Sequence, residues 1–435
     1  MKKTILMMSV LAMALGLVAK DYDVIVAGGG PAGIGAGYAA AKRGAKVLVL
    51  ERAGRLGGMA VQALVNPWLG GVDSPETHAI IRSLGDPHTV DFQKLDVKAY
   101  DLLKQAGADV LLHASVLGPL MDGQRVVGVR VQCEEGERTF PSKIVIDATG
   151  NGIVAAAAGV PYEIGRSEDG LVQPVSIMFA VDGINPKKRF LSGSEESARR
   201  LKVGDKTWEA IVQEEIAAGN LPPEVGVIRL YKSVSPTMNG VNATQVNGIN
   251  GTKSEDLTRA EIIARKQAFQ VTDVLRRRLP GYENVRIAQM PAVVGVRETR
   301  RFEGVARLEK ADCLAGRTFP DAIVRKADFC IDIHNPAGAG QAKGHDTTVT
   351  GEAERVRPYD IPYGALVPKK VDGLLIAGRC ISTSHEALAS CRVMRIAMAT
   401  GIGAGAAAAY AVQNNIEVRA VPAAKLNLFS QKKAR

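Results

Sequence analysis

The sequence predicts an α/β protein built on a parallel sheet, with a mixed α+β domain inserted into the chain. Two observations lead to this prediction. A short apolar run, Asp21 to Ala27, is followed by an Ala-rich helical segment, Pro31 to Arg43, and by a second apolar run, Ala45 to Glu51. Strands that are buried on both faces appear as continuous apolar, β-branched runs, so these segments form one βαβ unit. A similar strand, Gly373 to Gly378, returns near the C-terminus.

The segments after this unit extend the same sheet. We expect a helix from Val97 to Gln105 and a strand from Ala108 to Leu112. The stretch from Ser115 to Phe140 alternates well in Val126 to Val131, as a small antiparallel meander does, and Lys143 to Ala148 is another buried strand. Together these elements predict a Rossmann-like domain of three-layer β/β/α character.

The pattern changes between residues 161 and 355. A strand-like run, Val175 to Val181, is followed by a helix from Thr258 to Leu279, which Pro280-Gly281 would end. After the returning strand, a long Gly/Ala-rich helix is expected from Ala387 to Val412. The middle of the chain is therefore predicted to be a separate substrate domain.

Composition limits the classes of function. The chain has 435 residues, of which 46% are hydrophobic and 23% charged, and a net charge of +10. Basic residues cluster only locally, as in Arg276 to Arg278, without a long basic arm, which argues against nucleic-acid binding. The five cysteines form no C-x-x-C pair, so the sequence does not support a metal site.

The first residues have the composition of a signal peptide. Lys2 and Lys3 precede an apolar run from Thr4 to Ala19, and Leu17-Val18-Ala19 fits a cleavage site. We expect export to the periplasm or beyond, with no stable membrane span after the signal is removed. An uncleaved anchor is the alternative. The predicted organisation is a signal peptide (1–19), a nucleotide-binding domain (20–160 and 356–415), a substrate domain (161–355) and a C-terminal tail (416–435).

A glycine-rich loop joins the first strand to the first helix. Gly28, Gly30 and Gly33 have G-x-G-x-x-G spacing. Gly28 permits a tight turn, Gly30 lets the backbone approach a pyrophosphate, and Gly33 lets helix and strand pack closely. Glu51 ends the second strand, where its carboxylate can accept hydrogen bonds from ribose hydroxyls. The unit is therefore predicted to bind a dinucleotide.

The residues after Glu51 favour FAD over NAD. Many flavoproteins of the glutathione-reductase-like superfamily have a Gly-Gly pair where Gly57-Gly58 stands, beside the isoalloxazine. Asp147 to Gly150 resembles the second nucleotide-contacting strand of that superfamily, and Gly373 to Arg379 resembles its C-terminal motif. FAD is the expected cofactor, and an NAD-dependent dehydrogenase that uses only the first βαβ unit is the alternative.

Four blocks of sequence narrow this resemblance. They are LGGMAVQALVNPWLG (56–70), GVRETRR (295–301), YDIPYGALVP (359–368) and GLLIAGRCISTSHEALASCRVM (373–394). Their order and spacing resemble the FAD dependent oxidoreductase family of largely uncharacterised bacterial flavoproteins. The resemblance implies a fold, FAD binding and redox chemistry, but no substrate.

The resemblance also implies roles for single residues. The loop glycines and Glu51 would hold the ADP half, Gly57 to Met59 would line the flavin, and Gly378 and Arg379 would lie at the ribityl chain. The helix after His385 is expected to direct its positive end at the flavin. The expected cofactor-binding residues are Gly28, Gly30, Pro31, Ala32, Gly33, Glu51, Arg52, Gly57, Gly58, Met59, Ala148, Thr149, Gly150, Gly378 and Arg379.

Two residues are expected to be catalytic. His385 could exchange a proton at the flavin edge, and the alternative is that it holds the start of a helix. Arg297 begins a charged cluster, residues 297–301, and could clamp an anion through its guanidinium. A solvated ion-pair network is the alternative, which we favour for the other arginines of this cluster. His334, after a strand-like run, could also face the pocket.

The leading hypothesis is an enzyme that transfers a hydride between flavin N5 and a small organic substrate, which an arginine clamp would require to be anionic. No second dinucleotide fingerprint is evident, so an external electron acceptor or donor is expected as a partner. The alternatives are the NAD-dependent dehydrogenase and a non-catalytic flavin-binding electron-transfer partner.

Overall fold

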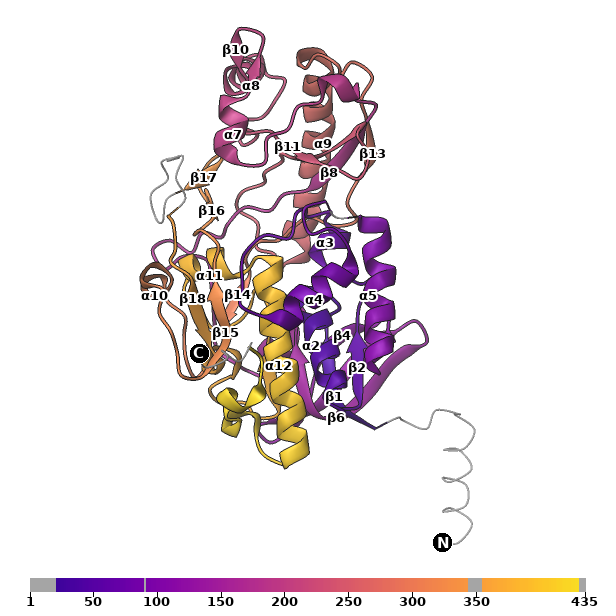
Figure 1. The fold of residues 1–435 in the computed structure, drawn as a ribbon, viewed down its shortest axis with the longest axis vertical. Coiled ribbons are helices and arrows are strands. Elements are labelled where there is room, and N and C mark those ends of the chain that lie inside the picture. Colours follow the sequence, from indigo (N-terminus) through magenta and orange to yellow (C-terminus); the bar gives the residue numbers. More distant parts are fainter. Residues whose placement is uncertain (1–20, 90, 343–353, 430–435) are drawn as a thin grey trace, which may run out of the picture.

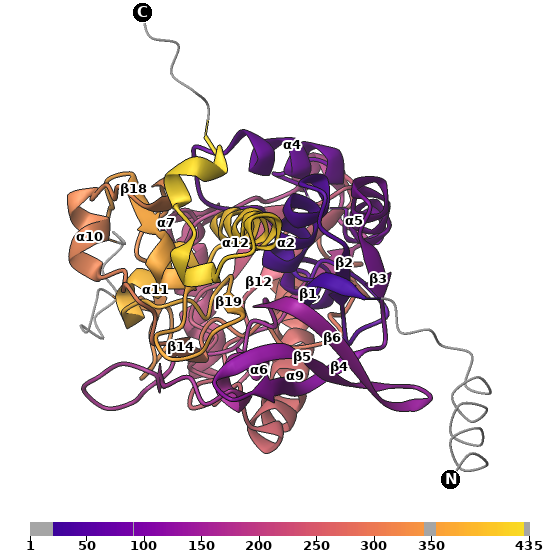
Figure 2. The ribbon, with the colours of Figure 1, turned by 90° about the horizontal axis from the view of Figure 1, so that it is seen from below.

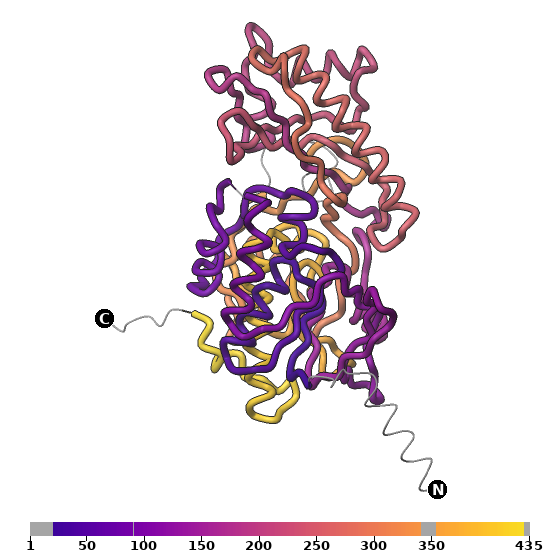
Figure 3. Tube along the Cα trace, turned by 90° about the vertical axis from the view of Figure 1, so that its right-hand side faces the viewer, coloured from indigo at the N-terminus to yellow at the C-terminus, as the bar shows by residue number. Residues whose placement is uncertain are grey.

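The computed structural model describes residues 21–89, 91–342 and 354–429. The predicted signal peptide and the last residues of the predicted tail, 430–435, lie outside these described residues. The described chain has two parts, one above the other in Figure 1 and seen from the side in Figure 3. The lower part contains both the N-terminal strands and the C-terminal helix, so the chain leaves this part and returns to it.

A seven-stranded sheet organises the lower part. Its order is β3-β2-β1-β6-β5-β4, and β19 pairs with β6. The pairs β1–β2, β2–β3, β1–β6 and β19–β6 are parallel, whereas β4, β5 and the first half of β6 form an antiparallel meander. The strands are Tyr22–Ala27 (β1), Val47–Leu50 (β2), Asp109–Leu111 (β3), Ser115–Asp122 (β4), Arg125–Cys133 (β5), Gly136–Asp147 (β6) and Leu374–Ile376 (β19).

Helices cover one face of the parallel strands, and the meander lies on the other side (Figure 2). This arrangement confirms the predicted Rossmann-like α/β fold with β/β/α layers. The helices of this part are Pro31–Lys42 (α2), Met59–Gln62 (α3), Pro75–Leu84 (α4), Phe92–Ala106 (α5), Ile153–Ala157 (α6), Lys310–Ala315 (α10), His385–Cys391 (α11) and Met394–Asn414 (α12). Short 3₁₀ turns follow at Tyr363–Leu366 (η2), Val418–Ala420 (η3) and Ala423–Leu426 (η4).

The upper part is a four-stranded antiparallel sheet of order β11-β12-β8-β13. It has its own apolar core, in which Phe179 and Val241 of the sheet pack with Trp208 and Val271 of two helices. Its elements are Met178–Asp182 (β8), Pro186–Lys188 (η1), Glu195–Arg200 (α7), Lys202–Val203 (β9), Lys206–Thr207 (β10), Trp208–Ala217 (α8), Arg229–Lys232 (β11), Met238–Asn242 (β12), Ser254–Arg278 (α9) and Arg286–Gln289 (β13).

Six further short strands of the described chain pair with one another outside these two sheets. These strands are Tyr162–Ile164 (β7), Arg300–Phe302 (β14), Ala322–Ala327 (β15), Ile333–His334 (β16), Gln341–Ala342 (β17) and Tyr359–Pro362 (β18). Buried residues between Phe302 and Ala327 pack in the core of the lower part, although the sequence analysis placed them in the substrate domain. Several residues between Val418 and Leu428, in the predicted tail, are also buried in this core. The predicted domain boundaries stay predictions.

Two helices differ in extent from the prediction. The helix predicted from Val97 begins at Phe92, because the Asp91 side chain accepts hydrogen bonds from the first backbone N–H groups and caps it. The single helix predicted from Ala387 to Val412 is two helices, α11 and α12, since Val393 has an extended conformation (φ −64°, ψ 148°). This break creates a second helix N-terminus within the segment.

Helices α2 and α12 pack with almost no side chain between them. A Cβ atom on Gly401 would lie 1.9 Å from the carbonyl oxygen of Ala32, and one on Gly405 would lie 2.2 Å from that of Ala36. Among the described helices, α12 is long and apolar enough to cross a membrane by length and composition, but 83% of its most apolar window is buried inside the protein. We therefore interpret α12 as a core helix.

Replacing Gly401 with alanine is expected to destabilise the protein by about 1–3 kcal/mol, because the added methyl group forces two backbones apart. Gly193→Ala is the matched control, since a Cβ there has no atom within 4 Å. The free energies of unfolding from urea titrations compare the variants. Equal values for Gly401→Ala and the wild type would contradict the close packing of these helices.

Candidate active site

The glycine-rich loop holds the start of α2 against the sheet. Gly28 has φ +104°, and a Cβ atom on it would lie 2.5 Å from the carbonyl oxygen of Ala148 on the neighbouring strand. A Cβ on Gly33 would lie 1.8 Å from the Gly28 carbonyl oxygen. No side chain caps α2 at Gly30, so the unpaired N–H groups of its first turn are left for a ligand.

Glu51 is fixed beside this loop by two backbone hydrogen bonds. The Gly29 N–H donates to its Oε2 at 2.7 Å, and the Ala53 N–H donates to its Oε1 at 2.9 Å. Each carboxylate oxygen can accept two hydrogen bonds, so each keeps one site for another donor. The carboxylate is thus oriented and still able to bind a pair of hydroxyl groups.

A second loop touches the first one, backbone against backbone. The Gly57 N–H donates to the Gly29 carbonyl oxygen at 2.8 Å. Gly58 has φ +50°, and a Cβ atom on it would lie 2.7 Å from the Cα atom of Gly30. The two loops therefore form one bare surface, and α3 begins directly after Gly58.

A buried carboxylate positions the end of β6. Asp147 is fully buried and accepts hydrogen bonds from the N–H of Thr149 at 3.1 Å and the N–H of Ala155 at 2.9 Å. Burial raises the pKa of Asp147 above its ordinary value, and these hydrogen bonds oppose that shift. The result is a fixed turn in which Thr149 and Gly150 face the same space as the glycine loop.

Arg379 closes this side of the site. Its guanidinium donates to Asn151 Oδ1 at 2.6 Å, while its Nε is buried without a hydrogen-bond partner among the described residues. Burial, and after it the charges of Arg52 and Arg392, lowers the pKa of Arg379 to about 10. The side chain is still charged at neutral pH, and it would be stabilised by an anion.

These residues surround one cavity of about 290 Å³. All the expected cofactor-binding residues line it except Gly33 and Gly57, which instead make the close backbone contacts of the two loops. The N-terminus of α12 also faces the cavity through Val393, Met394 and Ala397. The helix whose N-terminal residues line the cavity is therefore α12, whereas the helix that directly follows Ser384, and was expected to point at the flavin, is α11.

The structure does not bring His385 to this cavity. Its Nδ1 lies 2.9 Å from Glu298 Oε1, and its Nε2 is buried without a hydrogen-bond partner among the described residues. The Glu298 side chain is fully buried and also pairs with Arg301. A desolvated carboxylate needs such partners, so His385 holds a buried ion-pair network and the start of α11.

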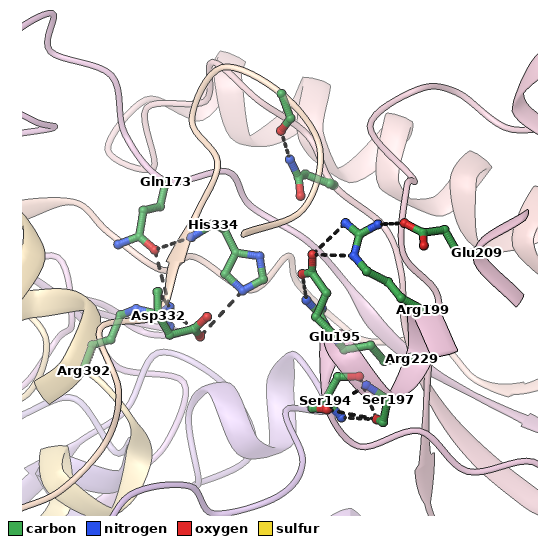
Figure 4. Close-up of polar contacts among 12 residues, drawn as sticks. Gln173, Ser194, Glu195, Ser197, Arg199, Glu209, Arg229, Asp332, His334 and Arg392 are labelled. Carbon is green, nitrogen blue, oxygen red and sulfur yellow. Dashed lines mark hydrogen bonds and ion pairs between the residues drawn. The ribbon is translucent and has the colours of Figure 1, made fainter. Parts of the chain in front are cut away.

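The wall of the cavity opposite the glycine loop comes largely from the upper part and its connections. Arg297 donates to the carbonyl oxygen of Pro174 at 2.7 Å. Burial, followed by the charge of Arg392, lowers its pKa to about 9. His334 lines the same wall, and its Nε2 is 3.7 Å from Asp332 Oδ2 (Figure 4). The predicted arginine and the alternative histidine thus face one space.

Several polar residues of this wall were not predicted from the sequence, among them Asp332, Arg392, Tyr231 and Asn242. Asp332 and Arg392 interact through the Arg392 guanidinium, which lies 2.9 Å from the Asp332 carbonyl oxygen and 3.4 Å from its Oδ2. Tyr231 and Asn242 come from paired strands of the upper sheet. Arg392 stands in a block that carries the family resemblance, which could have pointed to it. Nothing local in the sequence marks the other three.

Comparisons with known proteins agree with this site. The model of the FAD dependent oxidoreductase family matches residues 23–428. The chain is 32% identical over 166 residues to digeranylgeranylglycerophospholipid reductase 2 of Methanopyrus kandleri, and this alignment covers 34% of this chain and 40% of that protein. It is 30% identical over 155 residues to thiamine thiazole synthase of Methanococcus vannielii, and that alignment covers 30% of this chain and 57% of the synthase. The chain thus matches about two fifths of the length of the first of these relatives.

A solved geranylgeranyl bacteriochlorophyll reductase-like protein from Thermoplasma acidophilum aligns over 91% of this chain and 79% of its own, with 15% identity and a TM-score of 0.47. The relatives named here are archaeal, so the bacterial, glutathione-reductase-like grouping stays a prediction. The family match covers nearly all of the described chain. This protein therefore belongs to the FAD dependent oxidoreductase family and is an enzyme with FAD as its cofactor.

Proposed function

We propose that this enzyme exchanges a hydride and a proton with a small organic substrate bound at the upper wall of the cavity. The observation that carries the proposal is that one cavity joins the glycine loop to that wall. Gly30, Gly58 and Gly378 line one side of it, and Arg297 and His334 line the other. A substrate on this wall would lie next to the cofactor and between the two parts of the chain.

The residues on the lower side fit FAD. The bare surface of Gly30 and Gly58 allows a flat ring or a pyrophosphate to approach the backbone. Glu51 keeps acceptor sites for ribose hydroxyls, and the Arg379 guanidinium lines the cavity without a carboxylate partner among the described residues, so it could pair with an anionic group. Together with the first turn of α2, these residues would hold the cofactor.

Bound FAD would supply the acceptor or donor of two electrons and a hydrogen. The chain itself tunes the charge of the site. The N-terminus of α12 and the guanidinium of Arg379 both place positive charge at the cavity, which favours the more negative, reduced form of a cofactor. Met59 and Val393 add apolar surface that limits water in the site. An external acceptor or donor would complete the redox cycle.

Gly58→Ala is expected to weaken FAD binding by about tenfold or more, because its methyl group would separate two loops that touch. The FAD content per chain after dialysis, and the dissociation constant from flavin fluorescence, measure the effect. Gly248→Ala is the matched control, since Gly248 also has a positive φ, of +66°, but a Cβ there meets nothing within 4 Å. Undiminished FAD binding by Gly58→Ala would contradict this placement of the cofactor.

Anaerobic titration of the purified holoenzyme with hydroxy acids, sugars and cyclic compounds tests the redox proposal. We expect at least one compound to bleach the flavin absorbance, and an added electron acceptor to restore it. The product should contain two hydrogens fewer than the donor, as mass spectrometry would show. A holoenzyme that no donor bleaches, and whose dithionite-reduced form no organic acceptor reoxidises, would refute the proposal.

A further inference from the structure

Arg297 is a charged group of the cavity wall that, like Arg379, has no carboxylate partner among the described residues. Its side chain donates a hydrogen bond to a backbone carbonyl oxygen, that of Pro174. Among the described residues no carboxylate oxygen lies within 4.0 Å of its guanidinium nitrogens, whereas nearby arginines have such partners. Moving a guanidinium out of water without a counter-ion is costly, so this position favours a bound anion.

The charges around Arg297 are paired in the protein. Arg392 lies 3.4 Å from Asp332 Oδ2, and Arg229 lies 2.7 Å from Glu195 Oε2. Figure 4 shows these two pairs on either side of His334. Among the described residues, Arg392 and Arg229 thus each have a carboxylate partner within 4.0 Å and Arg297 has none, so Arg297 is the guanidinium of this group that a carboxylate could pair with.

His334 lies beside Arg297 and is held in a fixed orientation. Its backbone N–H donates to Gln173 Oε1 at 3.3 Å, and its ring Nε2 faces Asp332 at 3.7 Å. Among the described residues, His385 Nε2 is fully enclosed by protein atoms and has no hydrogen-bond partner. Neither ring nitrogen of His334 is in that position. The ring can therefore hydrogen-bond to a molecule in the cavity.

Burial lowers the pKa of His334 well below its ordinary value, and Arg297, Arg229 and Arg392 lower it further in that order. The imidazole is thus neutral at physiological pH and able to accept a proton. A second, small cavity of about 10 Å³, close to the volume that one water requires, lies behind it. Arg297, His334 and Glu224 all line this second cavity, so a water there could contact both the imidazole and a carboxylate.

We propose that the substrate is a small 2-hydroxy carboxylate, whose carboxylate binds Arg297 and whose hydroxyl group donates a hydrogen bond to His334. The assignment rests on the proposed function. Because both side chains line the same two cavities, the anionic group and the reacting oxygen must be close neighbours in the substrate, as they are in a 2-hydroxy acid.

The reaction that follows is balanced. The hydroxyl proton would pass to His334 as the C2–O bond becomes a carbonyl, and the hydrogen of the broken C2–H bond would leave as a hydride. The acid would thus be oxidised by two electrons to a 2-oxo acid, with bound FAD supplying the two-electron acceptor. Arg297 keeps the carboxylate in place throughout, and Asp332 stabilises the protonated form of His334 through the 3.7 Å contact.

Binding of 2-oxo acids tests the carboxylate site without turnover. Glyoxylate, pyruvate, phenylpyruvate and 2-oxoglutarate are titrated into the oxidised holoenzyme, and binding is followed by isothermal titration calorimetry and by the rise in melting temperature. At least one should bind, and Arg297→Met should weaken that binding by about thirtyfold or more. Arg189→Met is the control, because Arg189 also bonds to neutral groups, Asn239 among them, but lies outside both cavities. Arg189→Met should bind the same acid with the affinity of the wild type.

Three results would overturn the carboxylate assignment. They are the absence of binding by all four acids, equal affinity in Arg297→Met and the wild type, and tighter binding of inorganic phosphate than of any of the acids.

Failure of the carboxylate assignment can be distinguished from failure of the redox proposal. If 2-oxo acids bind through Arg297 but no donor bleaches the flavin, the redox proposal fails and the anion site stands. If only an uncharged donor bleaches the flavin, the carboxylate assignment fails and the redox proposal stands.

The imidazole of His334 has its own measurement. In holoenzyme labelled with ¹⁵N-histidine, the His334 signal is identified by its loss in His334→Gln. Its chemical shift should remain that of a neutral imidazole well below pH 6.5. The best-binding 2-oxo acid should raise this pKa, since its negative charge offsets Arg297, Arg392 and Arg229. Among the described residues, the carboxylates that face the ring are Asp332, 3.7 Å away, and Glu224 across the small cavity, and both are present in the free and bound states.

The exposed His88 and His113 serve as internal controls whose signals should not move. His334→Gln should also slow flavin reduction by a 2-hydroxy acid by about a hundredfold, with little change in 2-oxo acid binding. An unmoved His334 signal on binding, or full reduction rate in His334→Gln, would overturn the proton-acceptor role.

Discussion

The site depends on a backbone contact between two helices that are far apart in the sequence. Gly401 and Gly405 of α12 leave space for the carbonyl oxygens of α2, which lies on the parallel sheet. This contact fixes the N-terminus of α12 next to the glycine loop. Without it, the break at Val393 would leave a helix end with no defined place, and the cavity would lose the wall formed by Val393, Met394 and Ala397.

Close backbone contacts at glycines also occur where the two loops meet. Gly28 faces the end of β6, Gly33 faces the Gly28 carbonyl group, and Gly58 faces Gly30. Each glycine removes a side chain that would occupy the space of the cofactor or push its supporting elements apart. Polar groups then set orientation, since Glu51 and Asp147 are each held by backbone N–H groups. Glycines shape the site, and buried carboxylates keep that shape constant.

The sequence allowed prediction of the features that depend on local order. Strand, glycine loop, helix and Glu51 follow one another within about thirty residues, so their arrangement follows from the βαβ unit itself. Features that depend on distant contacts could not be read in this way. His385 and His334 are both flanked by plausible motifs, yet Glu298 retains His385 in a buried pair, and only His334 reaches the cavity. The break before α12 was also hidden, because Val393 is compatible with a helix and tertiary packing decides its conformation.

The two parts of the chain contribute different chemistry to the one cavity, and Gln173 connects them. Its backbone N–H donates to Glu298 in the network of His385, and its side-chain Oε1 accepts from the backbone N–H of His334 and, at 3.4 Å, from Arg392. A buried ion-pair network that looks remote from the cavity thereby positions two residues of its wall. The lower part fixes where the cofactor can lie, and the upper part, through Gln173, is held in register with it. Arg297 donates to the carbonyl oxygen of Pro174 and the His334 N–H donates to the neighbouring Gln173, so this one short segment fixes the spacing of the anion site and the proton acceptor.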